Sequence, residues 1–192
     1  MPPSVKLLIV ADHASNYIPK RYNNLGLEIK DIFTHKAFDP GVRELAINLS
    51  NKFKSQLVLG EFSRLLIDCN RDLNDPTLIS VISDRKIILG NKKITRKDRI
   101  YRINKIYRPY HEKINSKILE KKINIIISLH SFNPIFKGRK RFLKYGILSN
   151  QDRRLSELLI SELKKSKNIV GDNEPYKGSL IGDTLYKHAL KR

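Results

Sequence analysis

Cysteine is almost absent from this sequence of 192 residues, which contains a single one, Cys69. One cysteine excludes an internal disulfide framework, and the lack of a Cys-x-x-Cys pair or a cysteine–histidine ladder argues against a structural zinc finger. No general base lies near Cys69 in the sequence, so we interpret it as a small packing residue rather than a nucleophile.

Long apolar runs are also missing. The apolar stretch near the start, residues 5–11, is too short for a signal peptide or a membrane span, and no other segment reaches the length of a transmembrane helix. The apolar share of 40% is ordinary, and a chain of this length can bury a core. We therefore expect one soluble, cytoplasmic domain without a membrane partner.

Acidic residues are scarce: 19 Asp and Glu stand against 38 Lys and Arg, a formal net charge of +19. Such a charge attracts phosphate backbones or acidic surfaces. The lysines, however, are spread along the chain together with many Ile and Asn residues, as over residues 121–125, which also fits a proteome-wide bias in amino-acid usage. Basic charge without a recognition motif supports only non-specific binding, so we predict no specific nucleic-acid partner.

Short apolar runs alternate with segments of helical periodicity, which predicts a single α/β domain with a largely parallel, helix-covered sheet. In the helix that begins near residue 40, we expect Asp39 to cap the N-terminus and five apolar residues to face the core: Val42, Leu45, Ala46, Leu49 and Phe53. Strands are predicted over residues 5–11, 56–61, 65–68, 123–129, 145–148 and 169–170, and helices over residues 40–53, 95–122 with an interruption at Pro109, and 152–165.

Two histidines follow predicted buried strands: His13 after residues 5–11 and His130 after residues 123–129. In open α/β sheets ligands bind at the carboxyl ends of the strands. Zinc is commonly held by imidazole and oxygen ligands with one position left for water, and two histidines on separate strand-end loops can converge on one metal ion. Taken singly, each histidine could instead be a hydrogen-bonded loop residue. Their recurrence after buried strands indicates a metal site.

A third polar group, Asn70-Arg71, follows the predicted strand over residues 65–68. An arginine fork suits bidentate capture of a carboxylate, and Asn70 adds an amide donor. The alternative is a structural ion pair between Asp68 and Arg71. Arg64 could serve either purpose.

Two further histidines have simpler interpretations. His35 lies four residues before Asp39 and could meet it if the helix began early, but helix capping by Asp39 is the simpler reading. His111 lies on the long amphipathic segment over residues 95–122 and is interpreted as structural.

Six segments spread from about Leu7 to His188 carry a resemblance when they are taken together and in order. They are Asp12-His13-Ala14-Ser15-Asn16, His35 with Asp39-Pro40-Gly41, Ser63-Arg64-Leu65 continuing to Arg71, Tyr107-Arg108-Pro109-Tyr110-His111, Leu129-His130-Ser131-Phe132-Asn133-Pro134 and Gly171-Asp172-Asn173-Glu174-Pro175-Tyr176. Together they resemble the N-formylglutamate amidohydrolase family. The resemblance implies a phosphorylase/hydrolase-like, three-layer α/β sandwich with a mixed, largely parallel sheet, similar to zinc carboxypeptidases and aspartoacylase.

The family resemblance implies a zinc-dependent amidohydrolase that acts on a small-molecule N-acyl amino acid and, in the type reaction, converts N-formyl-L-glutamate and water into formate and L-glutamate. His13 and His130 match the two metal-binding histidines, and Asn16 stands where the wider fold has a glutamate ligand. Because an amide oxygen is neutral, the metal ion would be held less tightly or another residue, such as Asp12, would complete the site. Asn70 and Arg71 match the pair that clamps the substrate carboxylate. Arg64 is a further candidate for substrate binding.

Family members continue past the position of His188 into another strand, which carries a Glu-x-Arg motif with the expected general base. This sequence ends at Leu190-Lys191-Arg192. We therefore expect residues 1–192 to form one C-terminally truncated domain that lacks this strand, and we identify no catalytic carboxylate in it. The alternative function is a catalytically impaired relative that only binds a metal ion or a carboxylate ligand.

Overall fold

The computed structural model describes residues 4–136, 138–178 and 180–190. The chain forms two compact units: unit 1 comprises Met1–Phe132 and Gly182–Arg192, and unit 2 comprises Asn133–Ile181. Each is described by itself. Among the described residues, no helix combines the length and the apolar character needed to cross a membrane.

Unit 1 is built around a parallel sheet of three strands, β1 (Leu7–Ala11), β2 (Gln56–Leu59) and β5 (Ile125–Ser128), in the order β2-β1-β5. The central strand β1 is almost entirely buried, as its unbroken apolar sequence predicts. Because all three strands are parallel, their carboxyl ends lie at the same edge of the sheet, and the loops after them begin side by side there.

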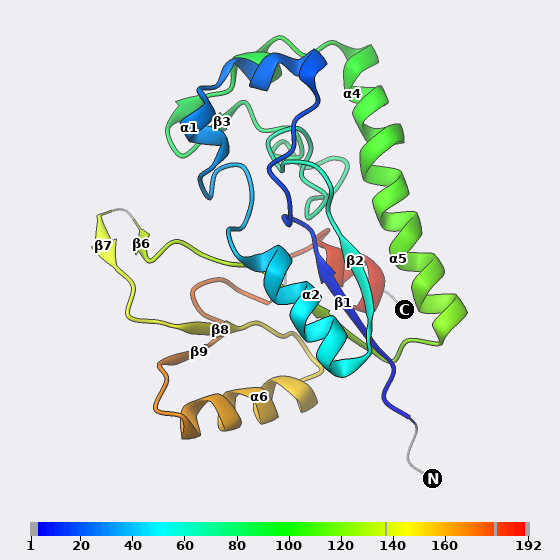
Figure 1. The fold of residues 1–192 in the computed structure, drawn as a ribbon, viewed down its shortest axis with the longest axis vertical. Helices are drawn as coiled ribbons and strands as arrows, with labels where there is room; N and C mark the ends of the chain where they lie inside the picture. Colours follow the sequence, from blue (N-terminus) through cyan, green and yellow to red (C-terminus); the bar gives the residue numbers. More distant parts are fainter. Residues whose placement is uncertain (1–3, 137, 179, 191–192) are drawn as a thin grey trace. The chain divides into compact units, whose positions relative to one another are not determined.

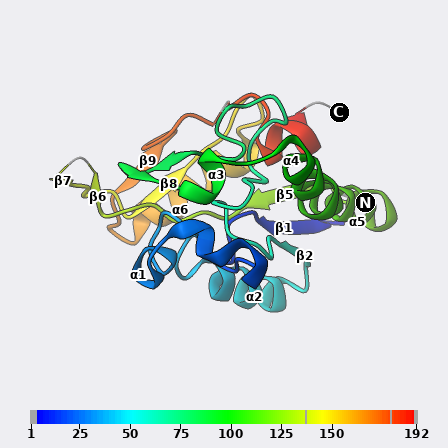
Figure 2. The ribbon, with the colours of Figure 1, turned by 90° about the horizontal axis from the view of Figure 1, so that it is seen from above.

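Helices cover both faces of this sheet, which confirms the layered α/β fold (Figure 2). Alternate residues of β1 point to opposite faces. Ile9 and Ala11 pack in one apolar cluster with Val42 and Ala46 of α2 (Val42–Phe53). Leu8 and Val10 belong to a second, larger cluster with residues of α5 (Arg108–Lys121).

A long helical column crosses unit 1, formed by α4 (Arg96–Arg102), a π-helical turn (Ile103–Tyr107) and α5 (Figure 1). Pro109 lies inside this continuous column, directly after the π-helical turn, and cannot donate a hydrogen bond to the turn before it. The interruption predicted at Pro109 takes the form of this wider turn, and the chain stays helical through the proline.

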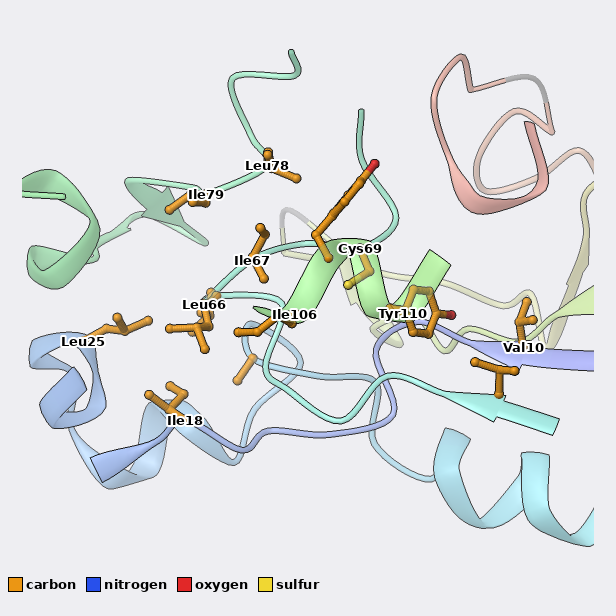
Figure 3. Packing of buried hydrophobic residues seen from close by; sticks show 14 of the residues in the cluster. Val10, Ile18, Leu25, Leu66, Ile67, Cys69, Leu78, Ile79, Ile106 and Tyr110 are labelled. Atoms are coloured by element: carbon orange, nitrogen blue, oxygen red, sulfur yellow. The ribbon is translucent and has the colours of Figure 1, made fainter. Parts of the chain in front are cut away.

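The predicted strand over residues 65–68 is wrong. These residues are buried, but they form a turn and irregular chain, and side chains instead of a neighbouring strand satisfy two of their carbonyl groups. Asn91 donates to the Leu65 carbonyl at 2.7 Å and Arg102 donates to the Leu66 carbonyl at 3.0 Å. Figure 3 shows the neighbouring Cys69 side chain among Ile106 and other core residues, which agrees with a packing role.

The start of α2 also differs from the prediction. Its N-cap is Gly41, in a left-handed conformation with φ of 78°, and Asp39 makes no capping bond. Leu45 and Phe53 are 47% and 59% exposed, so the core-facing stripe of α2 is narrower than predicted.

The remaining short elements of unit 1 are a 3-10 segment (Lys20–Gly26), α1 (Ile29–Ile32), the antiparallel pair β3 (Ile82–Ser83) and β4 (Lys86–Ile87), α3 (Leu89–Lys92), and a second π-helical turn (Tyr186–Leu190).

Unit 2 contains a parallel pair of strands, β8 (Tyr145–Ile147) and β9 (Val170–Asp172), against which α6 (Arg154–Lys165) packs. These three elements were predicted and are confirmed. A Cβ atom at Gly146 would lie 2.3 Å from the Glu174 carbonyl oxygen, so this close approach requires glycine. The hairpin of β6 (Ile135–Phe136) and β7 (Arg139–Lys140) completes the described part of this unit.

Candidate functional site

The two predicted histidines meet at the carboxyl edge of the sheet in unit 1. Val10 of β1 pairs with Ser128 of β5, so the loops that follow the two strands start next to each other. The ring centroids of His13 and His130 lie 5.0 Å apart, with an angle of 61° between the planes. His13 is buried, whereas the His130 side chain is about one-third exposed (33%). The convergence that the sequence indicated is therefore present.

Asp39 supplies an oxygen between these rings. Its Oδ2 atom lies 3.7 Å from His13 Nδ1 and 3.0 Å from His130 Nδ1. The candidate ligand atoms of the three residues all lie within 4.8 Å of one another. The Asp39 backbone N–H donates to the His13 carbonyl at 2.9 Å, which ties the two loops together. Two imidazoles and a carboxylate form a donor set that zinc accepts.

The other nitrogen of each histidine faces a second carboxylate. His13 Nε2 lies 2.7 Å from Asp68 Oδ1, and His130 Nε2 lies 3.3 Å from Asp12 Oδ2. An ionised carboxylate can only accept, which assigns the proton of the His13 ring to Nε2 and leaves its Nδ1 lone pair facing Asp39. His130, in contrast, faces a carboxylate at each of its two nitrogens. Pairs of this kind fix the orientation of metal-binding histidines in proteins.

Two hydrogen-bonding requirements are unsatisfied in the cluster formed by His13, His130 and Asp39. His13 Nδ1 is buried and has no hydrogen-bond partner, although burial of a polar atom normally demands one. The neutral ring of His130 cannot donate to Asp39 and Asp12 at once. A proton between His130 Nδ1 and Asp39 Oδ2 would resolve only the second conflict, whereas a metal ion bound by His13, His130 and Asp39 would resolve both. The residues present therefore fit a metal ion.

The charges of the cluster suit metal binding. Burial lowers the pKa of His13 despite the opposing effect of Asp68, which keeps the ring neutral at pH 7. Burial alone would raise the pKa of Asp68, but the charge and hydrogen bond of His13 outweigh it and lower that pKa to about 2. The pKa of Asp12 is likewise lowered against the effect of burial, chiefly by the hydrogen bond and charge of His130. Both carboxylates are thus ionised acceptors at neutral pH.

Asn16, the third ligand suggested by the sequence, lies beside this group. Its Nδ2 atom donates to the Ile32 carbonyl at 3.3 Å, and it lines a cavity of about 480 Å³ together with Asp39, Arg43 and other residues. Asp39 lies between the two imidazoles, and the assignment of Asn16 as a metal ligand stays a prediction.

The residues predicted to bind the substrate lie in different surroundings. Arg64 forms an ion pair with Asp39 Oδ1, so it neutralises the carboxylate of the cluster. Arg71 donates from Nε to Thr77 Oγ1 at 3.2 Å and from Nη1 to the Asn70 carbonyl at 3.0 Å. In the described part of the chain no ion pair joins Arg71 to Asp68, because Asp68 pairs with His13.

Asn70 forms one hydrogen bond through its backbone and another through its side chain. Its backbone N–H donates to Asp68 Oδ1 at 2.8 Å, and its side-chain oxygen accepts from the Thr184 backbone N–H at 2.9 Å. Asp68 therefore contacts both the histidine of the cluster and the residue predicted to bind a carboxylate.

Sequence reasoning missed the roles of Asp39 and Thr184 in this site. Asp39 was read as a helix cap, although His35 Nε2 does lie 3.5 Å from its Oδ1 atom. Asp12, which directly precedes His13 at a strand end, was considered as a residue that could complete the metal site, and its Oδ2 atom faces His130 Nε2. His111, interpreted as structural, contacts His188: its Nδ1 atom meets His188 Nε2 at 2.8 Å.

The fold and the site define an α/β protein with a candidate metal centre of two histidines and one aspartate at the carboxyl edge of a parallel sheet. A family model described as N-formylglutamate amidohydrolase matches residues 5–192. The chain belongs to the N-formylglutamate amidohydrolase family, as the resemblance of its motifs indicated, and it is thus a member of a family of hydrolases.

The solved structures that are similar to this chain include the following two. The gene product Atu2144 from Agrobacterium tumefaciens shares 34% sequence identity with a TM-score of 0.91, and the match covers 97% of this chain and 76% of the other. An N-formylglutamate amidohydrolase from Ralstonia eutropha JMP134 shares 22% identity with a TM-score of 0.69, over 96% of this chain and 79% of the other. The second likeness shows the fold alone. No curated protein matches the chain.

Proposed function

We propose that this protein hydrolyses the N-formyl group, or another N-acyl group, of an acidic amino acid in a zinc-dependent reaction. With N-formyl-L-glutamate the products are formate and L-glutamate. The observation that carries the proposal is the convergence of His13 Nδ1, His130 Nδ1 and Asp39 Oδ2, one of them a buried nitrogen without a hydrogen-bond partner. Family membership supports the substrate class.

In this proposal His13, His130 and Asp39 hold the metal ion. A zinc ion in such a site lowers the pKa of its water and polarises the carbonyl of the scissile amide. Asp68 and Asp12 accept from the Nε2 atoms of the two rings and so keep each Nδ1 lone pair directed at the metal position. Arg64 neutralises the outer oxygen of Asp39 and fixes its orientation.

Asn70 and Arg71 are proposed to bind carboxylate groups of the substrate. Two of the three guanidinium nitrogens of Arg71 have partners within the protein, and Nη2 donates to none of the residues that the structure describes. A group positioned in this way can form a charge-assisted hydrogen bond with an anionic ligand.

Since Cys69 is a buried free thiol, nothing in the site requires an oxidising compartment, and we place the activity in the cytoplasm.

A second candidate function is binding without turnover. Asp12 and Asp68 lie beside the histidines, but each is already engaged by a ring of the cluster, which leaves neither available as a general base. A protein of this kind would bind zinc or a carboxylate ligand and gain thermal stability from it, yet release no formate.

Zinc content and formate release test the proposal together. Elemental analysis of the purified protein is expected to give about one zinc per chain, and N-formyl-L-glutamate is expected to yield formate. His130→Ala should lose both, whereas Asn48→Ala, on the exposed side of α2, should keep both. Equal zinc content and activity in His130→Ala would reject the metal assignment. Zinc binding without formate release would favour the second candidate.

A further inference from the structure

A segment from near the end of the chain, Gly182–Leu190, contacts the residues of the candidate site within unit 1. Three of its side chains reach different parts of the site. Thr184 contacts Asp12 and Asn70, Lys187 contacts Arg71, and His188 contacts α5. None of these contacts is needed to explain the metal ligands themselves.

Thr184 is fully buried (0% exposed), and its hydroxyl donates to Asp12 Oδ1. Tyr110 donates to the same oxygen at 2.9 Å. With Oδ1 occupied by two hydroxyl groups, Asp12 presents Oδ2 to the Nε2 atom of His130. The Thr184 hydroxyl therefore sets the orientation of the carboxylate that orients a metal ligand.

The backbone of Thr184 orients Asn70. A backbone N–H can only donate, so the side-chain oxygen of Asn70 must face it at the observed 2.9 Å. The amide nitrogen of Asn70 then points away from Thr184. Among the described residues this nitrogen donates to none, and it is not among the buried atoms that lack a partner. It is therefore a fixed donor that a ligand can reach.

The same segment also holds the backbone of Arg71. Lys187 Nζ donates to the Arg71 carbonyl at 2.9 Å, and Tyr107 donates to the same oxygen at 2.8 Å. His188 anchors the segment to α5, where its Nε2 atom meets His111 Nδ1 at 2.8 Å. Both members of the Asn70-Arg71 pair are thus fixed by residues 184–187.

We propose that Thr184 is a positioning residue that serves both halves of the site: its hydroxyl orients Asp12 toward His130, and its backbone N–H turns the amide nitrogen of Asn70 toward a carboxylate ligand. The identity of that ligand rests on the proposed function. The two contacts use different atoms of Thr184, so they can be separated by substitution.

Thr184→Val removes the hydroxyl with little change of shape and keeps the backbone N–H. Measured on the full chain by competition with a chelator, its zinc dissociation constant is expected to rise about tenfold, because a residue that supports a metal ligand contributes on this scale. The kcat for N-formyl-L-glutamate should fall, and KM should stay within about twofold. Thr184→Ser, which keeps the hydroxyl, should match the wild type within about threefold on each measure.

Asn70→Asp tests the other contact. The aspartate still accepts from the Thr184 N–H but replaces the amide donor with a negative oxygen that repels a carboxylate. We expect KM for N-formyl-L-glutamate to rise by about a hundredfold or more, with zinc affinity unchanged. This split between KM and zinc affinity would not arise from a general loss of structure.

Zinc affinity in Thr184→Val equal to that of the wild type, or equally poor in Thr184→Val and Thr184→Ser, would overturn the proposal for Asp12. An unchanged KM in Asn70→Asp would overturn it for Asn70. Should Thr184→Val fail to fold, Thr184→Ala provides the same hydroxyl deletion without a second methyl group. If the zinc-loaded wild type neither binds nor hydrolyses N-formyl-L-glutamate, the proposed function fails, while the zinc affinities still decide the role of Thr184.

Discussion

His13 and His130 use their two nitrogens in the same way, although they come from strands more than a hundred residues apart. Each Nε2 faces a carboxylate outside the cluster, and each Nδ1 faces Asp39 Oδ2. The outer carboxylates orient the two rings, and Asp39 completes the donor set. We therefore expect metal binding at the candidate centre to depend on the negative charge of Asp39.

Asp39→Asn tests this at constant size. Removal of the negative charge leaves two neutral imidazoles to bind zinc and leaves Arg64 next to an uncharged amide in a buried place. The zinc dissociation constant, measured by chelator competition, is expected to rise by about a hundredfold or more.

Asp31→Asn is a matched control, because Asp31 is also a buried aspartate with cationic partners, Lys36 and Lys86, but lies outside the cluster. It should lower thermal stability and leave zinc affinity unchanged. Equal loss of zinc affinity in both variants would show that the effect on Asp39→Asn comes from destabilisation and would remove Asp39 from the ligand set.

At the scale of single residues, the sequence predicted that His13 and His130 converge, but it did not reveal the contact of Asp39 with them. His13 and His130 each follow an apolar run, a pattern that can be read locally. Asp39 precedes Pro40-Gly41, which fits a helix start equally well, and only a tertiary contact with a residue 91 positions away reveals its other role. Arg64 shows the same difficulty, since its choice between a substrate and an ion pair depends on where Asp39 lies.

At the scale of elements, the site depends on how closely β2 and β1 approach at their carboxyl ends. Gly60 follows β2, and its N–H donates to the Ala11 carbonyl at 2.8 Å. A Cβ atom at Gly60 would lie 1.9 Å from the backbone oxygen of Asp12. Since the obstacle is backbone rather than a flexible side chain, any larger residue must displace the turn that carries Asp12 and His13.

Gly60→Ala is therefore expected to lower the free energy of unfolding by about 3 kcal/mol and to abolish tight zinc binding. Gly41→Ala is the comparison: a Cβ there meets nothing within 4 Å, and only the left-handed backbone, with φ of 78°, opposes it. That strain costs about 1 kcal/mol. Chemical denaturation of both variants gives the difference, and a Gly60→Ala protein as stable as Gly41→Ala would contradict the close approach.

Most elements were predictable because their periodicity is local. The strands at residues 5–11, 56–61 and 123–129, the helical column with its wider turn before Pro109 and the helix of unit 2 all appear, with ends shifted by a few residues. The segment over residues 65–68 was not predictable, because a buried apolar run forms a strand only where a neighbouring strand has free backbone groups. Here Asn91 and Arg102, distant in sequence, satisfy two of its carbonyls instead.

The contact between α5 and the Tyr186–Leu190 turn has a pH dependence that can be stated with its sign. Burial lowers the pKa of His111 to about 4, from 6.5 in the unfolded chain. The unfolded state therefore binds more protons between these values, and the stability contributed by neutral His111 is complete above about pH 6.5 and lost as the pH falls toward 4.

His111→Gln removes this titration while its amide nitrogen can still donate to the Cys69 carbonyl, as His111 Nε2 does at 3.0 Å. Thermal unfolding followed from pH 7.5 to pH 4.5 should show a smaller loss of stability on acidification in the variant than in the wild type. Parallel curves for the two proteins would show that His111 does not stay neutral in the folded chain.

For the whole molecule, the net charge of +19 attracts anions, whereas the candidate metal centre is suited to a cation. The positive charge favours weak binding to any polyanion, and salt weakens this electrostatic attraction. The candidate centre, in contrast, gathers three carboxylates, of the 19 Asp and Glu residues in the chain, around two histidines. The basic surroundings would assist the approach of the proposed anionic substrate, and the acidic cluster would retain the proposed cation.

Metal binding should therefore stabilise the folded chain in a manner that depends on pH. Zinc binds the deprotonated forms of imidazole and carboxylate, so protons compete with the metal ion for the ligands of the cluster and binding weakens as the pH falls. At a free zinc concentration about a hundred times the dissociation constant, the folded state gains about 2.7 kcal/mol, which raises Tm by about 5–10 °C for a chain of this size. We expect this increase at pH 7.5 and its disappearance near pH 5, measured by thermal unfolding with and without zinc. Asp39→Asn should show no increase at either pH, and a zinc effect of equal size in that variant would place the binding on surface residues instead of the cluster.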